Sequence, residues 1–223
     1  MQAIPNALPS PLPNTLPGPL LDPQVNAVIT RLEQARKRPS NGGPLGNAAN
    51  THDPHAYADI GFSIHPDQGN LIYLLLTHPE QLEAVRADRS LLPQAIEEGL
   101  RFEPPLLSIN RTTTCEVEIA GVTIGPDESI SPHIGSANHD ETRWENPETF
   151  DIFRPAIPHI AFAHGPHMCL GMHLARLETR ALLNRVFDRL PDLTLRPGND
   201  DPHIRGDIFR SPTSLPVTFS PTM

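Results

Sequence analysis

Prolines interrupt the start of this chain so often that neither a long helix nor a central strand can form there. Seven fall within the first 23 residues, and the whole chain of 223 residues contains 27. Because proline fixes φ and removes a backbone donor, such a stretch favours extended chain without a packed core. We therefore expect residues 1–53 to be a disordered segment with one short helix starting at Asp22. A proline-rich docking ligand around Pro11 is the alternative interpretation.

Residues 54–223 show the patterns of a packed domain, and the part up to about residue 105 is predicted to be helical. An apolar helix is expected over Gly69–Leu76. Thr77 is placed to cap the next helix, which has Pro79 near its start. A third helix ends before Pro104.

The second half of the domain changes period. Alternation over Cys115–Ile119 and again over Val122–Ile124 predicts two short strands, with Cys115 buried in the first. Leu215–Phe219 predicts another strand. A long helix follows Cys169 and ends at Pro191. Its apolar side is predicted to consist of Leu170, Leu174, Leu177, Ala181, Val186 and Leu190.

Charge and composition exclude several classes of protein. The net charge of −9 argues against non-specific binding of nucleic acid. The sequence contains no apolar run of ~18 residues, so we expect no membrane span. Two cysteines are too few for a disulfide framework. These features predict a cytoplasmic protein with reduced thiols.

Cys169 lies where a loop is expected to turn into the long helix. Free amide N–H groups and the positive end of a helix favour a thiolate at such a position, and soft metal centres bind thiolates. Gly165 and Gly171 flank the cysteine, so no side chain blocks a flat cofactor from lying against the backbone. His167 is placed to pair with an anionic edge of that cofactor.

Two other interpretations of Cys169 stay open on the residues alone. A lone cysteine is most often a buried small hydrophobe. A zinc site is the second alternative, because His164, His167 and His173 lie close by. The chain lacks the paired-cysteine spacing that is typical of structural zinc sites.

The stretch Phe162–Arg176 resembles the haem-binding loop of bacterial cytochromes P-450. It reads Phe-x-x-Gly-x-His-x-Cys-x-Gly-x-x-Leu-Ala-Arg, with Ala163 where the family usually has glycine. The resemblance runs from about Gly69 to Met223. It implies a mainly α fold with small β-sheets, the C-terminal, haem-proximal part of the cytochrome P-450 fold. It also implies haem b (iron protoporphyrin IX) as cofactor, with Cys169 as axial ligand of the iron. The implied cofactor-binding residues are Cys169, His167, Arg111, Phe162, Gly165 and Gly171.

Glu98 and Arg101 are three residues apart on an expected helix, so they share a face and can pair. Their surroundings resemble the E-x-x-R helix of the family, and Arg154 matches the third member of the family's network. The resemblance implies a buried charged network that fixes the cysteine loop.

Arg111 matches the arginine that contacts a haem propionate in the family, and His167 matches a second such contact. A guanidinium suits this role because it forms charge-assisted hydrogen bonds. Without the resemblance, Arg111 would be interpreted as an ordinary exposed arginine.

Too little sequence precedes Gly69 for a complete member of the family, so we expect an N-terminally truncated chain. Counting back, Phe62 and Ser63 take the places of the acid and the threonine in the family's oxygen-side helix. Ser63 is then the candidate catalytic residue, since Phe62 cannot deliver a proton. Pro66 would interrupt that helix at a cost of about 3 kcal/mol. We hypothesise that residues 1–68 are the product of a frameshift or a mis-set start.

The resemblance implies a haem-thiolate monooxygenase that inserts one oxygen atom from O₂ into a small organic substrate. Electrons would come from NAD(P)H through partners of the ferredoxin and ferredoxin-reductase type. A loop near Ile208–Pro212 is expected to help select the substrate. The alternative is a truncated, catalytically inactive remnant with weak or no haem binding.

Overall fold

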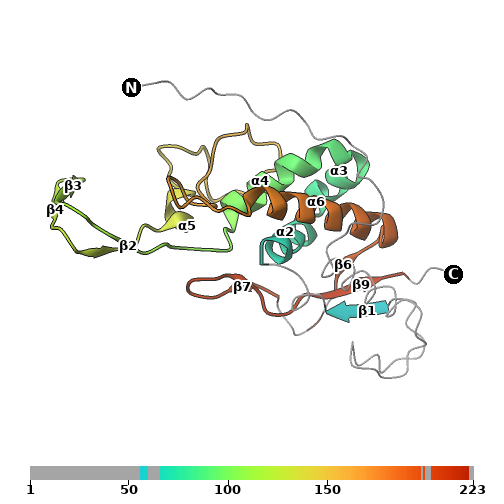
Figure 1. Cartoon of the computed structure of the whole chain (residues 1–223). Helices are drawn as coiled ribbons and strands as arrows, with labels where there is room; N and C mark the ends of the chain where they lie inside the picture. The colour runs from blue at the N-terminus through green and yellow to red at the C-terminus, as the bar shows by residue number, and fades with distance from the viewer. Residues whose placement is uncertain (1–55, 60–65, 197, 199–201, 221–223) are drawn as a thin grey trace.

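The computed structural model describes residues 56–59, 66–196, 198 and 202–220, and within these residues the fold is helices with small antiparallel sheets (Figure 1). The helices are α2 (Pro66–Thr77), α3 (Pro79–Ala87), the 3₁₀ helix η1 (Arg89–Leu91), α4 (Leu92–Phe102), α5 (Ile134–Ala137) and α6 (Met172–Arg189). The strands are β1 (Ala56–Asp59), β2 (Arg111–Thr112), β3 (Val117–Ile119), β4 (Val122–Ile124), β5 (Ser129–Ile130), β6 (Thr194–Leu195), β7 (Ile204–Arg205), β8 (Ser211–Pro212) and β9 (Pro216–Phe219). None of the helices described here is long and apolar enough to cross a membrane.

Prolines mark where the first helices begin. α2 starts at Pro66, and α3 starts at Pro79. The first position of a helix tolerates proline because its missing N–H would have no partner there. Between α3 and α4, the Asp88 carboxylate accepts a hydrogen bond from the Ser90 amide at 2.9 Å. These local signals account for the short, closely spaced helices of the N-terminal part of the described chain.

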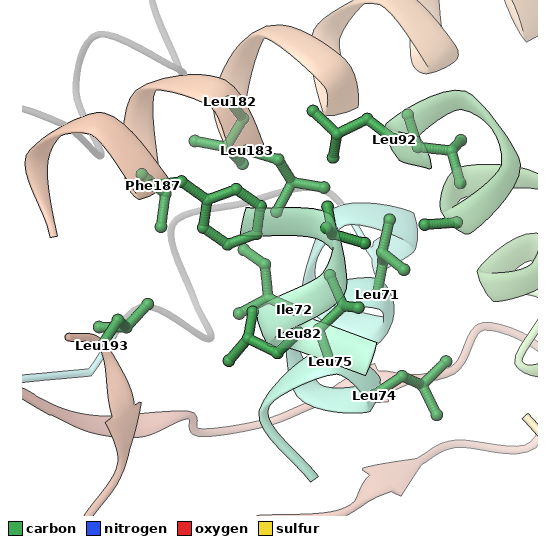
Figure 2. Close-up of a cluster of buried hydrophobic side chains, with 14 of the residues drawn as sticks. Leu71, Ile72, Leu74, Leu75, Leu82, Leu92, Leu182, Leu183, Phe187 and Leu193 are labelled. Atoms are coloured by element: carbon green, nitrogen blue, oxygen red, sulfur yellow. The ribbon is translucent and has the colours of Figure 1, made fainter. Parts of the chain in front are cut away.

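The hydrophobic core lies where α2, α3, α4 and α6 meet. Figure 2 shows leucines from these helices directed toward one another, among them Leu75, Leu82, Leu92 and Leu182. All four are buried. The core therefore joins helices from both ends of the described chain.

A three-stranded sheet lies against one side of the helical core. β9 is its central strand and pairs antiparallel with β1 and with β6. Val217 and Phe219 of β9 are buried in the core. The predicted strand at Leu215–Phe219 is confirmed, but the expectation of helix from residue 54 is wrong for β1. That strand forms because β9 pairs with it across a long stretch of sequence, and such pairing leaves no local signal.

The hairpin of β3 and β4 confirms two predicted strands and corrects the prediction for Cys115. The strands pair antiparallel, with Ile119 opposite Val122. Both of these side chains are exposed, and so is Cys115, which precedes β3. Alternation predicted a buried face, but this two-stranded sheet has no buried face because no layer covers it in the described part of the chain.

Thr77 does not cap α3 as expected. His78 is the residue before α3, and no side-chain hydrogen bond caps that end. The Thr77 hydroxyl instead donates to the carbonyls of Tyr73 and Leu74, both at 3.0 Å. Thr77 is the last residue of α2, so its hydroxyl reaches the preceding turn sooner than the next helix.

Residues 1–53 with their boundary, and Ser63, lie outside the described residues, so the predictions for them stay predictions. The same holds for the frameshift hypothesis.

The burial pattern predicts that replacing leucine by alanine destabilises the fold at one position and leaves it nearly unchanged at another. Leu75→Ala removes a side chain that is 1% exposed, so the free energy of unfolding should fall by about 3 kcal/mol. Leu170→Ala removes one that is 99% exposed, so the change should stay within about 0.5 kcal/mol. Urea unfolding of both variants measures this, and equal losses would contradict the assignment of the core.

Candidate functional site

The cysteine loop, residues 160–171, leads from an extended segment into α6 and is closed by its own backbone. The amide of Cys169 donates to the carbonyl of Phe162 at 3.0 Å. The amide of Met168 donates to the carbonyl of Gly165, also at 3.0 Å. These bonds fix where the cysteine backbone lies before any side chain contributes.

The thiol of Cys169 is exposed at the start of α6, so the interpretation as a buried hydrophobe is wrong. A Cβ added to Gly171 would lie 3.9 Å from the cysteine Sγ, in ordinary contact. Three apolar side chains close to it in the sequence, Met168, Leu170 and Leu174, are exposed as well. We call these three exposed residues next to the thiol the thiol face.

The thiol face corrects one sequence prediction. Leu170 and Leu174 were expected on the buried side of the long helix, but Leu170 precedes α6 and Leu174 is 57% exposed. The buried side begins farther along the helix, where Ala181 and Val186 enter the core. Periodicity cannot separate a residue that faces the core from one that faces a ligand, since both need apolar side chains.

Two residues of the loop have positive φ. Gly165 has φ +85°, and an added Cβ there would meet nothing within 4 Å. Ala163 has φ +65°, in the left-handed region that favours glycine. The residue that departs from the family pattern is thus held in a backbone conformation suited to the glycine it replaces.

Glu98 and Arg101 of α4 form a buried, two-pronged ion pair. The arginine Nε lies 2.7 Å from Glu98 Oε2, and its Nη2 lies 2.8 Å from Glu98 Oε1. The same guanidinium donates to the carbonyls of Asn138, Pro147 and Thr149. One side chain of α4 therefore holds the irregular segment that leads to the cysteine loop.

Arg154 contacts the same carboxylate. Its Nε lies 3.4 Å from Glu98 Oε1. It also donates to the carbonyls of Glu145, Asn146 and Thr149. The structure thus brings together the three residues that the sequence grouped.

Arg111 and His167 are less constrained. Arg111 lies in β2, where it donates to the carbonyl of its neighbour Asn110 at 2.9 Å. None of its hydrogen bonds within the described residues reaches the cysteine loop. His167 is exposed in the loop two residues before Cys169. His167 is exposed and Arg111 is partly exposed, so an anionic group can reach both.

Sequence reasoning missed three site residues: Glu97, His159 and Arg176. Arg176 Nε lies 2.5 Å and its Nη2 lies 2.7 Å from the two oxygens of Glu97. His159 Nε2 lies 3.1 Å from Glu97 Oε2. Burial raises the pKa of Glu97, but the hydrogen bonds from Arg176 and His159 outweigh it and lower the pKa to about 2. Arg176 belongs to the recognised loop pattern, which was the one available signal.

The zinc alternative finds no cluster to support it. Across the described parts of the chain, no group of three or more histidine, cysteine or acidic side chains is arranged to hold a metal ion. One exposed thiol beside exposed apolar side chains instead suits a cofactor whose own atoms already supply most of the ligands of its metal.

Comparison with known proteins agrees with this arrangement. A family model described as Cytochrome P-450 matches residues 71–216. Cytochrome P-450 107B1 of Saccharopolyspora erythraea is 42% identical over 151 residues, which cover 67% of this chain and 37% of the relative. The 6-deoxyerythronolide B hydroxylase of the same organism is 43% identical over 146 residues, 65% of this chain and 36% of the relative. The structure of cytochrome P-450 CYP109Q5 from Chondromyces apiculatus superposes with a TM-score of 0.66 at 37% identity, covering 70% of this chain and 40% of that one.

The helices and the cysteine loop that leads into α6 match the haem-proximal part of known cytochrome P-450 folds. The chain belongs to the cytochrome P-450 family. The predicted fold class is confirmed. The chain spans less than half the length of the three relatives compared with it. These relatives support membership of a monooxygenase family, and they give no added support to the alternative of an inactive remnant.

The residues present fit the haem that the family implies. An axial thiolate is one soft donor, and Cys169 is an exposed thiol. A porphyrin needs an apolar surface and backbone without bulk, and Leu170, Gly165 and Gly171 supply these.

The positive φ of Ala163 predicts that Ala163→Gly stabilises the chain. Glycine relieves roughly 1 kcal/mol of left-handed strain but gains entropy in the unfolded chain, so we expect a net gain of about 0.5 kcal/mol. Ala84→Gly within α3 should instead cost roughly 0.5–1 kcal/mol. Urea unfolding measures both, and losses in both variants would contradict the strain.

The lowered pKa of Glu97 predicts a pH-dependent contribution to stability. Because the folded value of about 2 lies below the ordinary 4.5, the carboxylate stabilises the fold above about pH 4.5, and this is lost as pH falls toward 2. The side chain is 40% exposed, so solvent screening leaves about 1 kcal/mol. Unfolding of Glu97→Gln against the parent chain at pH 7 and below pH 3 tests this. A difference that does not shrink at low pH would refute it.

Proposed function

We propose that this chain supplies the proximal half of a haem-thiolate monooxygenase site, with Cys169 as axial ligand of the haem iron. The exposed Cys169 thiol on the thiol face carries the proposal. Apolar surface left in water contributes binding free energy when a cofactor covers it, at roughly 25 cal/mol per Å². A porphyrin covering Leu170 and Leu174 would be held by that term as well as by the sulfur.

The chain's own residues then have separate tasks. When bound, the haem supplies the oxidation chemistry, and its thiolate ligand favours cleavage of the O–O bond. Phe162, Gly165 and Gly171 shape the backbone against which the ring lies. Arg111 and His167 pair with the propionates, for which a guanidinium and an imidazole N–H are suitable donors.

The remaining assignments follow the same proposal. The network of Glu98, Arg101 and Arg154 holds the segment before the cysteine loop. Ser63 is the candidate proton donor on the oxygen side. Residues 54–223 form the partial cytochrome P-450 domain, and residues 1–53 are a separate proline-rich segment.

The reaction would insert one atom of O₂ into a small organic substrate. The name of the 6-deoxyerythronolide B hydroxylase, a relative over 65% of this chain, supports hydroxylation as the reaction type. Electrons would come from NAD(P)H through ferredoxin and ferredoxin-reductase type partners. The exposed Ile208 and Phe209, in the loop expected near the substrate, are candidates to touch it.

Haem titration of the purified chain tests the proposal. The ferrous chain with carbon monoxide should give a red-shifted Soret band of the thiolate type, and Cys169→Ala should abolish it because the sulfur ligand is gone. Cys115→Ala is the matched control, since Cys115 is also an exposed thiol and should leave the band unchanged.

Each outcome decides something. A thiolate band that persists in Cys169→Ala would overturn the ligand assignment. Failure of the parent chain to take up haem would support the inactive remnant instead. If Cys115→Ala alone abolishes the band, the wrong cysteine has been assigned.

A further inference from the structure

We infer that Glu97 is a positioning residue for Cys169, acting through Arg176 on one side of the cysteine and His159 on the other. The inference rests on the proposed function only in taking the Cys169 sulfur as the group to be positioned. We call Glu97, Arg176, His159 and Phe162 the loop clamp. It is distinct from the Glu98 network, which holds the segment before the loop.

The first arm of the clamp runs to α6, on the C-terminal side of the cysteine. Arg176 grips both oxygens of Glu97, at 2.5 and 2.7 Å. The same side chain donates to the carbonyl of Met172 in the first turn of α6 at 3.2 Å. A two-pronged pair fixes direction as well as distance. The helix end that follows Cys169 is therefore tied to α4.

The second arm runs to the N-terminal side of the cysteine. His159 Nδ1 accepts a hydrogen bond from the Ala161 amide at 3.1 Å, so the ring proton lies on Nε2. That Nε2–H is then the donor to Glu97 Oε2 at 3.1 Å. The imidazole of His159 is 5% exposed, so water competes little for these bonds. The part of the loop that precedes Cys169 is therefore bonded to the same carboxylate.

The two arms converge on Phe162. The guanidinium of Arg176 lies 4.6 Å from the centroid of its ring, and the ring of His159 lies 6.3 Å from it. The carbonyl of Phe162 accepts the hydrogen bond from the Cys169 amide. A fixed Phe162 therefore fixes the acceptor that positions the cysteine backbone, and Glu97 acts on Cys169 without touching it.

Backbone hydrogen exchange of the whole chain at neutral pH tests the clamp. Glu97→Gln removes the charge that pairs with Arg176 and leaves His159 a weaker, neutral acceptor. We expect the Cys169 amide to exchange faster, by roughly tenfold, which corresponds to the loss of one charge-assisted hydrogen bond from the loop. Core amides such as that of Leu75 should change less, in line with the smaller global loss of stability. Arg176→Lys keeps the positive charge but loses the two-pronged pair with Glu97. The exchange rate of the Cys169 amide should therefore lie between those of the parent chain and of Glu97→Gln.

Glu83→Gln is the matched control. It breaks the 2.5 Å ion pair with Arg86 on α3 and touches no part of the loop. If Glu97→Gln accelerates Cys169 no more than Leu75, the residue is merely structural and the inference is wrong. If Glu97→Gln fails to fold, the same comparison of Cys169 with Leu75 in Arg176→Lys decides. The measurement needs no haem, so the clamp and the proposed function can fail independently.

Discussion

Two consecutive carboxylates on α4, Glu97 and Glu98, hold the irregular part of this fold. They face different partners because successive residues of a helix point in different directions. Glu98 meets two guanidiniums within a buried site, which leaves an excess of positive charge. Backbone carbonyls that accept from Arg101 and Arg154 compensate for it, including that of Thr149, which accepts from both. A buried ion pair adds little stability by itself, but breaking one by removing a partner is costly, so such a network selects one arrangement of the chain.

The segment from residue 138 to 171 needs this selection more than the rest of the domain. It contains no helix or strand. Its buried apolar side chains are few, among them Trp144, Phe150 and Ile152. Apolar burial alone holds a segment to the core without specifying its exact path, whereas directional bonds to α4 specify it. The cysteine is placed at the end of this segment, so the accuracy of its position comes from polar contacts and only indirectly from the core.

Spacing predicted local features of the structure, whereas the long-range contact of Arg154 with Glu98 was expected only from the family pattern. Glu98 and Arg101 pair across one helical turn, which spacing reveals. The pairing of Glu97 with Arg176 spans 79 residues, and no spacing rule reaches that far. The same reason explains why β1 was missed, since its partner β9 lies at the other end of the domain. The predictions for Cys115 and Thr77 were wrong for a different reason. Among the described residues no layer covers the hairpin beside Cys115, and the Thr77 hydroxyl bonds to carbonyls of its own helix instead of capping the next one. The family pattern located Cys169, while the physics of its loop could be seen only in three dimensions.

The burial of α6 changes along its length, and this division explains how one helix serves both the core and the site. Leu182, Val186 and Phe187 in its C-terminal turns are buried in the core that α2 and α4 share. Its N-terminal turn exposes Leu174, and Leu170 just before it is fully exposed. Since exposed leucines contribute little to folding, this end of the helix can be adapted to a ligand with little loss of stability. The free energy that the core turns contribute is what keeps the helix end, and the thiol beside it, in place. Arg176 lies between the two halves, where a tie to Glu97 resists motion of the exposed end relative to the anchored one.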